Sequence, residues 1–277
     1  MFEKYQEIWR CIVLGIVQGL TEFLPISSSF HLRLIPDLLG WPSIGLGLSA
    51  FLHLGTLLAV LIYFGKDLLE IAIETFKSLN SPKNFFSSLG FKIIIASLPA
   101  ILIGFFAHDF FEKIDQNLTI TTIFLILIGI LLFVSDLKPS NIIDLEKNIN
   151  WWQALLIGFG QATALISGVS RSGSTITVAR LLGFSRTESA RFSFLMGSPV
   201  ILGAGLYEVL KALKSTKSLE VSWTAAVMGG ICSAIVGYFA IKFLLKFLQT
   251  QSLFPFMLYR VIIGLFVLFG ISKGFFK

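Results

Sequence analysis

Long apolar runs separated by short polar connections dominate the chain. Each run is long enough to cross the hydrocarbon core of a bilayer as a helix, which takes roughly 20 residues. The connections carry lysines and acidic side chains. The pattern therefore predicts an all-α integral membrane protein with about six spanning helices. The predicted crossings are approximately 48–64, 91–108, 117–135, 189–210, 221–247 and 255–273.

Two further segments begin as apolar helices but then break. Residues 11–39 run into Pro25 and three consecutive serines, and residues 152–182 run into the small, hydroxyl-rich stretch 167–173. At membrane depth the backbone can unwind only where it is buried in protein or lines a wet cavity. We therefore expect two re-entrant helical hairpins, at about 11–39 and 152–182.

The two broken segments also resemble each other. Sliding the sequence by 143 positions superposes residues 15–52 on residues 158–195 and makes nine positions identical, where chance would supply roughly three or four. Each half then holds one hairpin and three crossings, so the second copy enters the membrane upside down. We expect a single membrane domain over 1–277, built from a first repeat half, 1–150, and an inverted second half, 151–277.

The composition agrees with a membrane protein and excludes several other classes. Hydrophobic residues make up 55% and charged residues 14%, whereas a soluble domain carries about a quarter charged residues. The net charge of +6 suits loops near anionic headgroups, and no nucleic-acid partner is expected. Glu22 interrupts the first apolar run and no small-residue cleavage site follows it, so we expect no removable signal peptide. Basic residues are spread too evenly to orient the chain.

The first hairpin places a carboxylate beside hydroxyls and an imidazole. Gln18 and Glu22 are four residues apart, so on a helix they share one face. A carboxylate inside an apolar segment is costly and marks a functional site or a buried ion pair. His31 follows Ser28 by three residues, a spacing that offers a base to a hydroxyl nucleophile. Ser28 is either that nucleophile or a phosphate ligand.

The second hairpin places Arg171 among serines and a glycine. The planar guanidinium of arginine binds phosphate in a bidentate way, and a helix starting here would aim its positive end at an anion. With both turns together, the site suits phosphoryl transfer from an anionic headgroup, with a divalent cation on Glu22. The expected substrate-binding set is Gln18, Ser27, Ser29, Ser170, Ser172, Gly173 and Thr175.

Simpler interpretations exist for the same residues. Glu22 and Arg171 would also fit a purely structural salt bridge, and Ser27 and Ser29 would fit helix caps, which is compatible with binding phosphate. His53 lies outside both motifs, and we expect it to be a packing or interfacial residue.

At these two stretches the sequence resembles the bacterial undecaprenyl-diphosphate phosphatases of the bacitracin-resistance type. Residues 18–31 resemble the family's Glu/Gln-x-x-x-Glu box with its serine-rich turn, and residues 168–175 resemble its Pro-Gly-x-Ser-Arg-Ser-x-x-Thr box. Three positions depart from the pattern: Gln18 replaces a second glutamate, Phe30 a glycine and Ser167 the proline. The Gln18 departure weakens any two-carboxylate metal site.

The resemblance implies removal of the terminal phosphate from a C55 polyprenyl diphosphate, which regenerates the lipid carrier of cell-wall synthesis and confers bacitracin resistance. It implies an essential group of Glu22, Ser28, His31 and Arg171 and a divalent cation, magnesium or calcium. It also implies action at the outer face of the bacterial cytoplasmic membrane. The expected partners are the lipid and the membrane, with a homodimer left open.

Other activities compete with this one. A phosphatase of the phosphatidic-acid type, which uses a histidine nucleophile, needs a second histidine downstream of the Ser-Arg motif. The last histidine of this chain is His108, well before Arg171, so we reject that type. A transporter or flippase of an isoprenoid phosphate lipid remains the alternative, because inverted repeats with broken helices are also a transporter architecture. A scaffold would leave Glu22 and Arg171 without a role. The nucleophile stays open between Ser28, His31 and water.

Overall fold

The computed structural model describes residues 2–140, 142–214 and 221–276, which are almost entirely helical. The helices are α1 (Phe2–Phe23), α2 (Ser28–Leu39), α3 (Leu46–Ser78), α4 (Pro82–Ser87), α5 (Leu89–Phe106), α6 (His108–Asp115), α7 (Leu118–Asp136), α8 (Leu145–Asn148), α9 (Trp151–Thr163), α10 (Arg171–Leu181), α11 (Arg186–Lys214), α12 (Trp223–Phe247) and α13 (Phe254–Ser272). In these ranges the only β-type pairing is an isolated bridge between Ile142 and Phe184. The all-α prediction is confirmed.

Five of these helices are long and apolar enough to cross a membrane: α3 from Gly47 onward, α5, α7, α12 and α13. They coincide with five of the six predicted crossings. The sixth, 189–210, falls in α11, where some side chains lie outside the described part of the structure, so that crossing stays a prediction. Large apolar side chains such as Phe105, Phe239 and Phe269 are exposed on the outside of these helices, as lipid contact requires.

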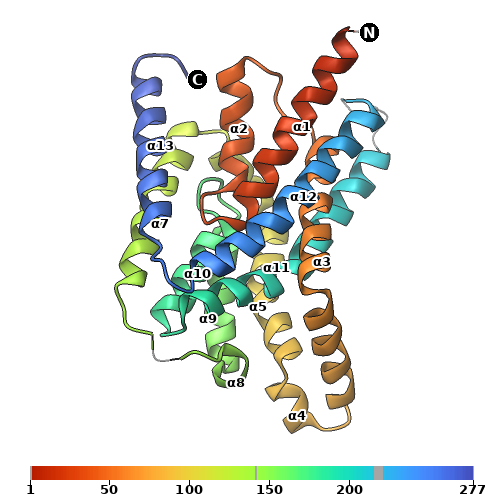
Figure 1. Cartoon of the computed structure of the whole chain (residues 1–277), viewed down its shortest axis with the longest axis vertical. Coiled ribbons are helices and arrows are strands. Elements are labelled where there is room, and N and C mark those ends of the chain that lie inside the picture. Colours follow the sequence, from red (N-terminus) through yellow and green to blue (C-terminus); the bar gives the residue numbers. More distant parts are fainter. Residues whose placement is uncertain (1, 141, 215–220, 277) are drawn as a thin grey trace.

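Helices from the two halves of the chain pack against each other. Helix α1 lies along α12, α12 also packs on α3, and α9 lies along α5, while α7 pairs with α13 (Figure 1). Glycines permit the close approaches. A Cβ on Gly15 would come within 2.2 Å of the Gly229 carbonyl oxygen, and one on Gly158 within 2.4 Å of the Ala96 carbonyl oxygen. Small residues at helix contacts let backbones pack closely inside a membrane.

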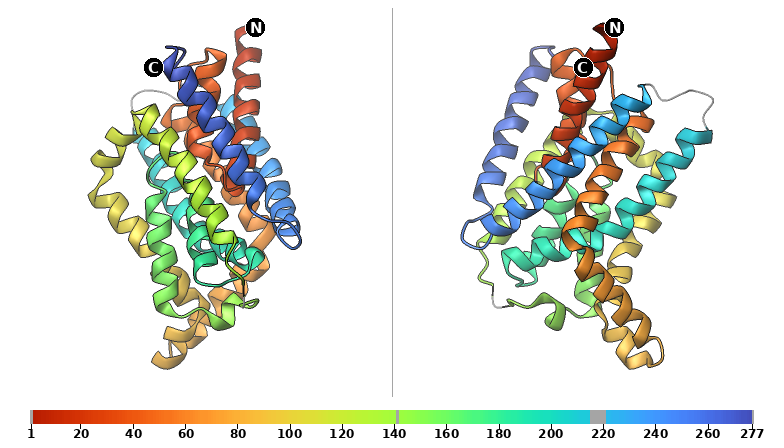
Figure 2. Two further views of the ribbon diagram at one scale, coloured as in Figure 1. Left: turned by 90° about the vertical axis from the view of Figure 1, so that its left-hand side faces the viewer. Right: turned by 45° about the vertical axis from the view of Figure 1, so that its right-hand side comes forward.

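Both predicted breaks are present, between α1 and α2 and between α9 and α10. We call residues 24–27 the first turn and residues 164–170 the second turn. Helix α2 runs back toward the end of the bundle where both chain ends lie, and α4 lies at the opposite end (Figures 1 and 2). A core of aromatic rings fills the interior beside the first turn, with the Phe23 and Phe194 rings packed edge to face at 5.4 Å.

Candidate active site

Pro25 explains the first break. A proline disfavours the helical conformation in the residue before it, and α1 accordingly ends at Phe23. The chain then turns, and α2 begins at Ser28. Ser27, between them, has φ 76°, in the left-handed region that residues with a side chain rarely adopt. Strained backbone of this kind persists only where the surrounding structure holds it, and it clusters at functional sites.

The second turn repeats this geometry at the positions that the 143-residue shift aligns. Ser170 has φ 71°, and it precedes α10 as Ser27 precedes α2. The Ser27 and Ser29 hydroxyl oxygens are 3.3 Å apart, and so are those of Ser170 and Ser172. The two turns thus share both an unusual backbone conformation and a hydroxyl–hydroxyl contact.

Helix capping accounts for one of the two strained serines. The Ser170 hydroxyl accepts a hydrogen bond from the Gly173 amide at 3.1 Å, so it caps α10. Ser27 occupies the matching position before α2 but its side chain makes no capping hydrogen bond. The Ser29 side chain instead lines an open cavity. The capping interpretation therefore does not explain the serines of the first turn.

Arg260, in the middle of α13, ties the two turns together. Its side chain is fully buried. Its Nη1 donates to the Pro25 carbonyl at 3.0 Å, and its Nη2 donates to the Gly168 and Val169 carbonyls at 2.8 and 3.1 Å. Its Nε donates to the Leu125 carbonyl of α7 at 2.8 Å. One guanidinium thus satisfies backbone oxygens that the broken helices leave free. Sequence analysis missed it, although an arginine inside the apolar run 255–273 was a signal.

Asp115 at the end of α6 contacts the middle of the second turn. Its Oδ1 accepts a hydrogen bond from the Ser167 amide at 2.8 Å. Burial raises the pKa of Asp115 above the usual carboxyl range, although the Ser167 amide opposes that shift. The Arg33 guanidinium of α2 donates to the backbone carbonyls of Asp115 and Gln116. The end of α6 therefore connects the second turn to the helix that follows the first.

The two predicted charges meet between the turns. Arg171 Nη2 lies 3.0 Å from Glu22 Oε1, and the two side chains are 13% and 7% exposed. Arg171 begins α10 and Glu22 lies in the last turn of α1. The Arg171 guanidinium packs against α11, where a Cβ at Gly197 would come within 1.3 Å of Arg171 Nη1. Any side chain at that position would displace the arginine.

The second oxygen of Glu22 holds the other polar groups of the first hairpin. The Ser28 hydroxyl donates to Glu22 Oε2 at 2.6 Å, and the Gln18 amide donates to the same oxygen at 3.2 Å. One carboxylate therefore contacts a potential nucleophile, an amide and a guanidinium. This arrangement can activate a hydroxyl, because a carboxylate within hydrogen-bonding distance can accept its proton.

His31 is placed differently from the sequence-based expectation. Its Nδ1 lies 2.7 Å from the Ser27 carbonyl oxygen, so it carries the hydrogen and donates. In the neutral ring Nε2 then accepts from the Tyr259 hydroxyl, 2.7 Å away. The Tyr259 ring also stacks on the imidazole at 5.6 Å. Both ring nitrogens are thus engaged away from Ser28, whose hydroxyl contacts Glu22.

The remaining predicted residues hold the second turn against its neighbours. The Ser172 hydroxyl lies 3.4 and 3.3 Å from the Glu22 and Leu24 carbonyls, which joins α10 to the end of α1. The Thr175 hydroxyl lies 2.7 Å from the Ser193 hydroxyl of α11. Both side chains are buried. In this structure they hold α10 against α1 and α11. Their expected contact with substrate stays a prediction.

A cavity of about 970 Å³ lies against α2, and we call it the polar cavity because several of its lining side chains are polar or charged. Ser29, Arg33 and Asp37 of α2 line it together with Ser49 and His53 of α3. The His53 Nδ1 donates to the Ser49 carbonyl at 2.9 Å, which in the neutral ring leaves Nε2 as an acceptor. His53 also lies within electrostatic range of Glu22. His53 therefore lies near the site. The sequence did not indicate this, because His53 is outside both motifs.

The donor set fits a cation that binds together with a phosphate. Among the described residues, no three or more histidine, cysteine, aspartate or glutamate side chains cluster as a metal cage. Glu22 supplies one carboxylate, and the Gln18 Oε1 beside it is buried without a hydrogen-bond partner. Magnesium and calcium prefer oxygen ligands, and magnesium is commonly held by one or two carboxylates plus substrate phosphates. Glu22 and Gln18 are the residues that would hold such an ion.

Comparison with known proteins gives consistent matches over nearly the whole chain. The family model for bacitracin resistance protein BacA matches residues 11–266. An undecaprenyl-diphosphatase of Thermomicrobium roseum is 43% identical over 275 residues, which cover 96% of this chain and 98% of that protein. An undecaprenyl-diphosphatase of Geotalea daltonii is also 43% identical, over 97% of this chain and 100% of that protein. An undecaprenyl-diphosphatase of Campylobacter concisus is 40% identical, over 95% of this chain and 98% of that protein.

We predict that Arg260→Met destabilises the protein by roughly 2 kcal/mol or more, because each buried carbonyl left without a donor costs about 1–3 kcal/mol. Thermal unfolding in detergent, followed by circular dichroism, measures the effect. Lys246→Met, an exposed position on α12, is the matched control and should unfold like the native protein. An Arg260→Met variant as stable as that control would contradict the role assigned to the guanidinium.

Proposed function

This chain belongs to the bacitracin resistance protein BacA family, and from that premise we propose how its two turns hydrolyse undecaprenyl diphosphate. The chain is a multi-pass membrane phosphatase that converts undecaprenyl diphosphate to undecaprenyl phosphate and inorganic phosphate. The names of its relatives and the match to the family model support this activity. The observation that carries the mechanism is the Glu22 carboxylate, which lies between the Ser28 hydroxyl and the Arg171 guanidinium.

The substrate diphosphate enters through the polar cavity. Ser29, which lines the cavity, directly follows Ser28, and this neighbourhood supports a path from the cavity to the first turn. Arg171 binds the terminal phosphate, since its guanidinium has five N–H donors and only some of them are used by Glu22 and the Ser193 carbonyl.

Ser28 is the nucleophile that the geometry supports best. As its oxygen attacks the terminal phosphorus, its proton passes to Glu22 Oε2, 2.6 Å away. The bond from that phosphorus to the bridging oxygen breaks, and the proton moves on to the departing undecaprenyl phosphate. Glu22 is then a carboxylate again and accepts a proton from the water whose oxygen attacks the phosphorus of the phosphoserine. The bond from phosphorus to the Ser28 oxygen breaks, Ser28 takes the proton back from Glu22, and inorganic phosphate leaves. His31 holds the strained Ser27 carbonyl and so positions the turn.

A divalent cation would sit on Glu22 and the Gln18 amide oxygen. When bound, it supplies neutralisation of charge on the phosphates. Gln18 contributes a neutral oxygen where a second carboxylate would hold the ion more strongly. Glu22 and Gln18 alone would leave ligand positions for the substrate phosphates to fill, so the protein without substrate would bind the ion weakly.

The membrane arrangement we propose is an inverted repeat with the halves 1–150 and 151–277. The matched strained serines, Ser27 and Ser170, and the reciprocal packing of α1 on α12 and α9 on α5 support it. In this arrangement α11 is the sixth crossing, and both broken helix pairs are re-entrant hairpins. The site faces the outer side of the bacterial cytoplasmic membrane. A homodimer stays a prediction.

Transport of an isoprenoid phosphate lipid is the weaker alternative. Moving a phosphate lipid needs cationic donors such as Arg171 but no hydroxyl with a base beside it. The 2.6 Å contact between Ser28 and Glu22 supplies that pair and favours hydrolysis.

We predict that the native protein in detergent releases phosphate from undecaprenyl diphosphate with magnesium or calcium and stops in EDTA. Ser28→Ala and Glu22→Gln should each lose about a hundredfold or more, because a nucleophile or its base is missing. Ser87→Ala, an exposed hydroxyl on α4, is the control and should keep native activity. Acid quenching during turnover should trap phosphate on Ser28. Native protein that is folded and binds the lipid but releases no phosphate would contradict the proposal.

We predict that Gln18→Glu lowers the magnesium concentration needed for half-maximal phosphate release, because the new carboxylate adds a charged ligand beside Glu22. A magnesium titration of activity at fixed substrate measures the shift. Gln249→Glu, which adds the same charge at an exposed position, should leave the titration unchanged. An unchanged magnesium requirement in Gln18→Glu would place the cation elsewhere.

A further inference from the structure

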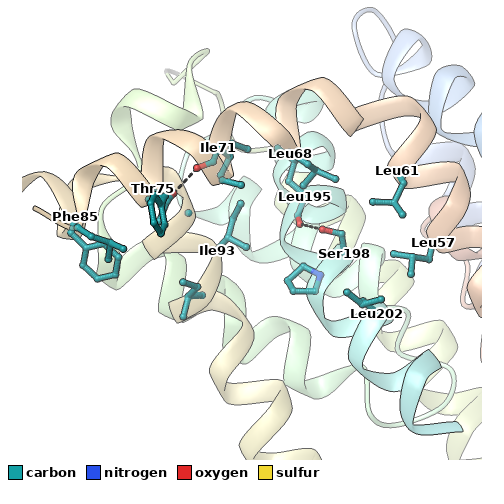
Figure 3. Close-up of a pocket in the computed structure, with 16 residues that line it drawn as sticks. Leu57, Leu61, Leu68, Ile71, Thr75, Phe85, Ile93, Leu195, Ser198 and Leu202 are labelled. Atoms are coloured by element: carbon teal, nitrogen blue, oxygen red, sulfur yellow. Dashed lines mark hydrogen bonds between the residues drawn. The ribbon is translucent and has the colours of Figure 1, made fainter. Parts of the chain in front are cut away.

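Helix α13 contacts the first turn and α2 with two consecutive polar side chains, Tyr259 and Arg260. The hydroxyls that line an apolar cavity of about 580 Å³ beside α3 and α11 are used differently, because Thr75 and Ser198 donate to carbonyls of their own helices (Figure 3). Arg260 holds the backbone of both turns, whereas Tyr259 contacts the imidazole of His31. The two neighbours on α13 therefore act on different groups of the site.

The Tyr259 contact fixes which nitrogen of His31 carries the hydrogen. The tyrosine hydroxyl lies 2.7 Å from Nε2, and the two rings stack at 5.6 Å with 17° between their planes. On the other side of the imidazole, Nδ1 lies 2.7 Å from the Ser27 carbonyl oxygen, which can only accept. The hydrogen is therefore on Nδ1, and Nε2 of the neutral ring accepts from the tyrosine. The His31 side chain is buried, so both nitrogens keep these partners.

The carbonyl that His31 holds belongs to the peptide group of the proposed nucleophile. The Ser27 carbonyl and the Ser28 N–H share one planar unit, so the direction of the carbonyl sets the direction in which Ser28 begins. Ser27 has φ 76°, a conformation that persists only where the surrounding structure holds it. The His31 hydrogen bond thus acts one residue before the hydroxyl that contacts Glu22.

The second turn makes the same contact with a different residue. The 143-residue shift superposes His31 on Ser174. The Ser174 hydroxyl donates at 3.0 Å to the carbonyl of Ser170, the strained serine of that turn. His31 Nδ1 donates to the Ser27 carbonyl in the same way. A hydroxyl can therefore hold such a carbonyl, and the contact needs neither a base nor a nucleophile. What the imidazole adds is a second nitrogen, and Tyr259 is bound to it.

We propose that Tyr259 is a positioning residue for hydrolysis. Its hydroxyl keeps His31 neutral with the hydrogen on Nδ1, and that hydrogen orients the peptide group between Ser27 and Ser28 so that the Ser28 hydroxyl meets Glu22. The proposal rests on the proposed function, because Ser28 is the nucleophile assigned there. His31 itself neither attacks phosphorus nor carries a proton during the reaction, since its two nitrogens remain bound to the carbonyl and the tyrosine.

The first test removes the tyrosine hydroxyl and keeps the ring. Tyr259→Phe should lower kcat for undecaprenyl diphosphate by about tenfold, because one buried hydrogen bond is lost. KM should stay nearly unchanged, because Arg171 is not affected. Tyr5→Phe, which removes a hydroxyl at an exposed position on α1, is the matched control and should keep the native kcat. Native kcat in Tyr259→Phe would overturn the proposal.

The second test asks whether Tyr259 acts through the imidazole. His31→Ser restores the donor that the second turn uses and should be about tenfold more active than His31→Ala. Adding Tyr259→Phe to His31→Ser should cause no further loss, because the partner of the tyrosine is already absent. A further tenfold loss would show that Tyr259 only packs against its neighbours. Equal activity of His31→Ser and His31→Ala would show that the carbonyl contact is not what the imidazole supplies. Where His31→Ser does not fold, His31→Asn, whose amide can donate to the same carbonyl, takes its place.

Nitrogen-15 NMR of histidine-labelled protein in detergent reads the imidazole without turnover. The chain has three histidines, and His31→Ser identifies the signals of His31 by removing them. Native protein should show the hydrogen on Nδ1 and none on Nε2, and the Nε2 signal should shift in Tyr259→Phe. A hydrogen on Nε2 in the native protein would contradict the proposal. Failure of the proposed function gives a different pattern, in which these signals are as expected but native protein releases no phosphate.

Discussion

The ion pair between Glu22 and Arg171 is the contact on which the rest of the site depends. Two charges that are 7% and 13% exposed are expensive to remove from water, and only close pairing with further hydrogen bonds compensates for that cost. Ser28 and Gln18 supply those bonds to Glu22, and the bare backbone of Gly197 makes room for Arg171. An anionic phosphate can therefore enter without leaving the arginine unpaired.

The pair can form only because two helices break at the same place. Broken helices expose carbonyls that lipid cannot satisfy, and Arg260 provides donors for both turns at once. Ser27 and Ser170 both have a left-handed backbone conformation. In each turn this serine's hydroxyl oxygen lies 3.3 Å from that of the serine two residues later, Ser29 or Ser172. The turn carbonyls that Arg260 binds therefore matter twice. They shape the turns that carry the site, and they are buried polar groups whose hydrogen bonds stabilise the membrane core. A change at Arg260 would alter both turns although it touches neither Glu22 nor Arg171 directly.

Sequence alone predicted the local features and, through the repeat, the meeting of the two turns, but it missed other long-range contacts. Pro25 and the serines marked the breaks, and single charges in apolar runs marked Glu22 and Arg171. The spacing of three between Ser28 and His31 suggested a nucleophile and its base. Ser28, however, is the first residue of α2, and its hydroxyl points back across the turn to Glu22. His31 instead meets a tyrosine 228 residues away, a contact that no local pattern encodes.

A double-mutant cycle on kcat/KM for undecaprenyl diphosphate tests most directly whether the two turns form one site. The cycle uses the native protein, Glu22→Gln, Arg171→Lys and the double variant. Groups that act as a unit give losses that are strongly non-additive, so the double variant should be nearly as active as the worse single variant. A double variant whose loss equals the product of the two single losses would show that Glu22 and Arg171 act independently and would contradict the account.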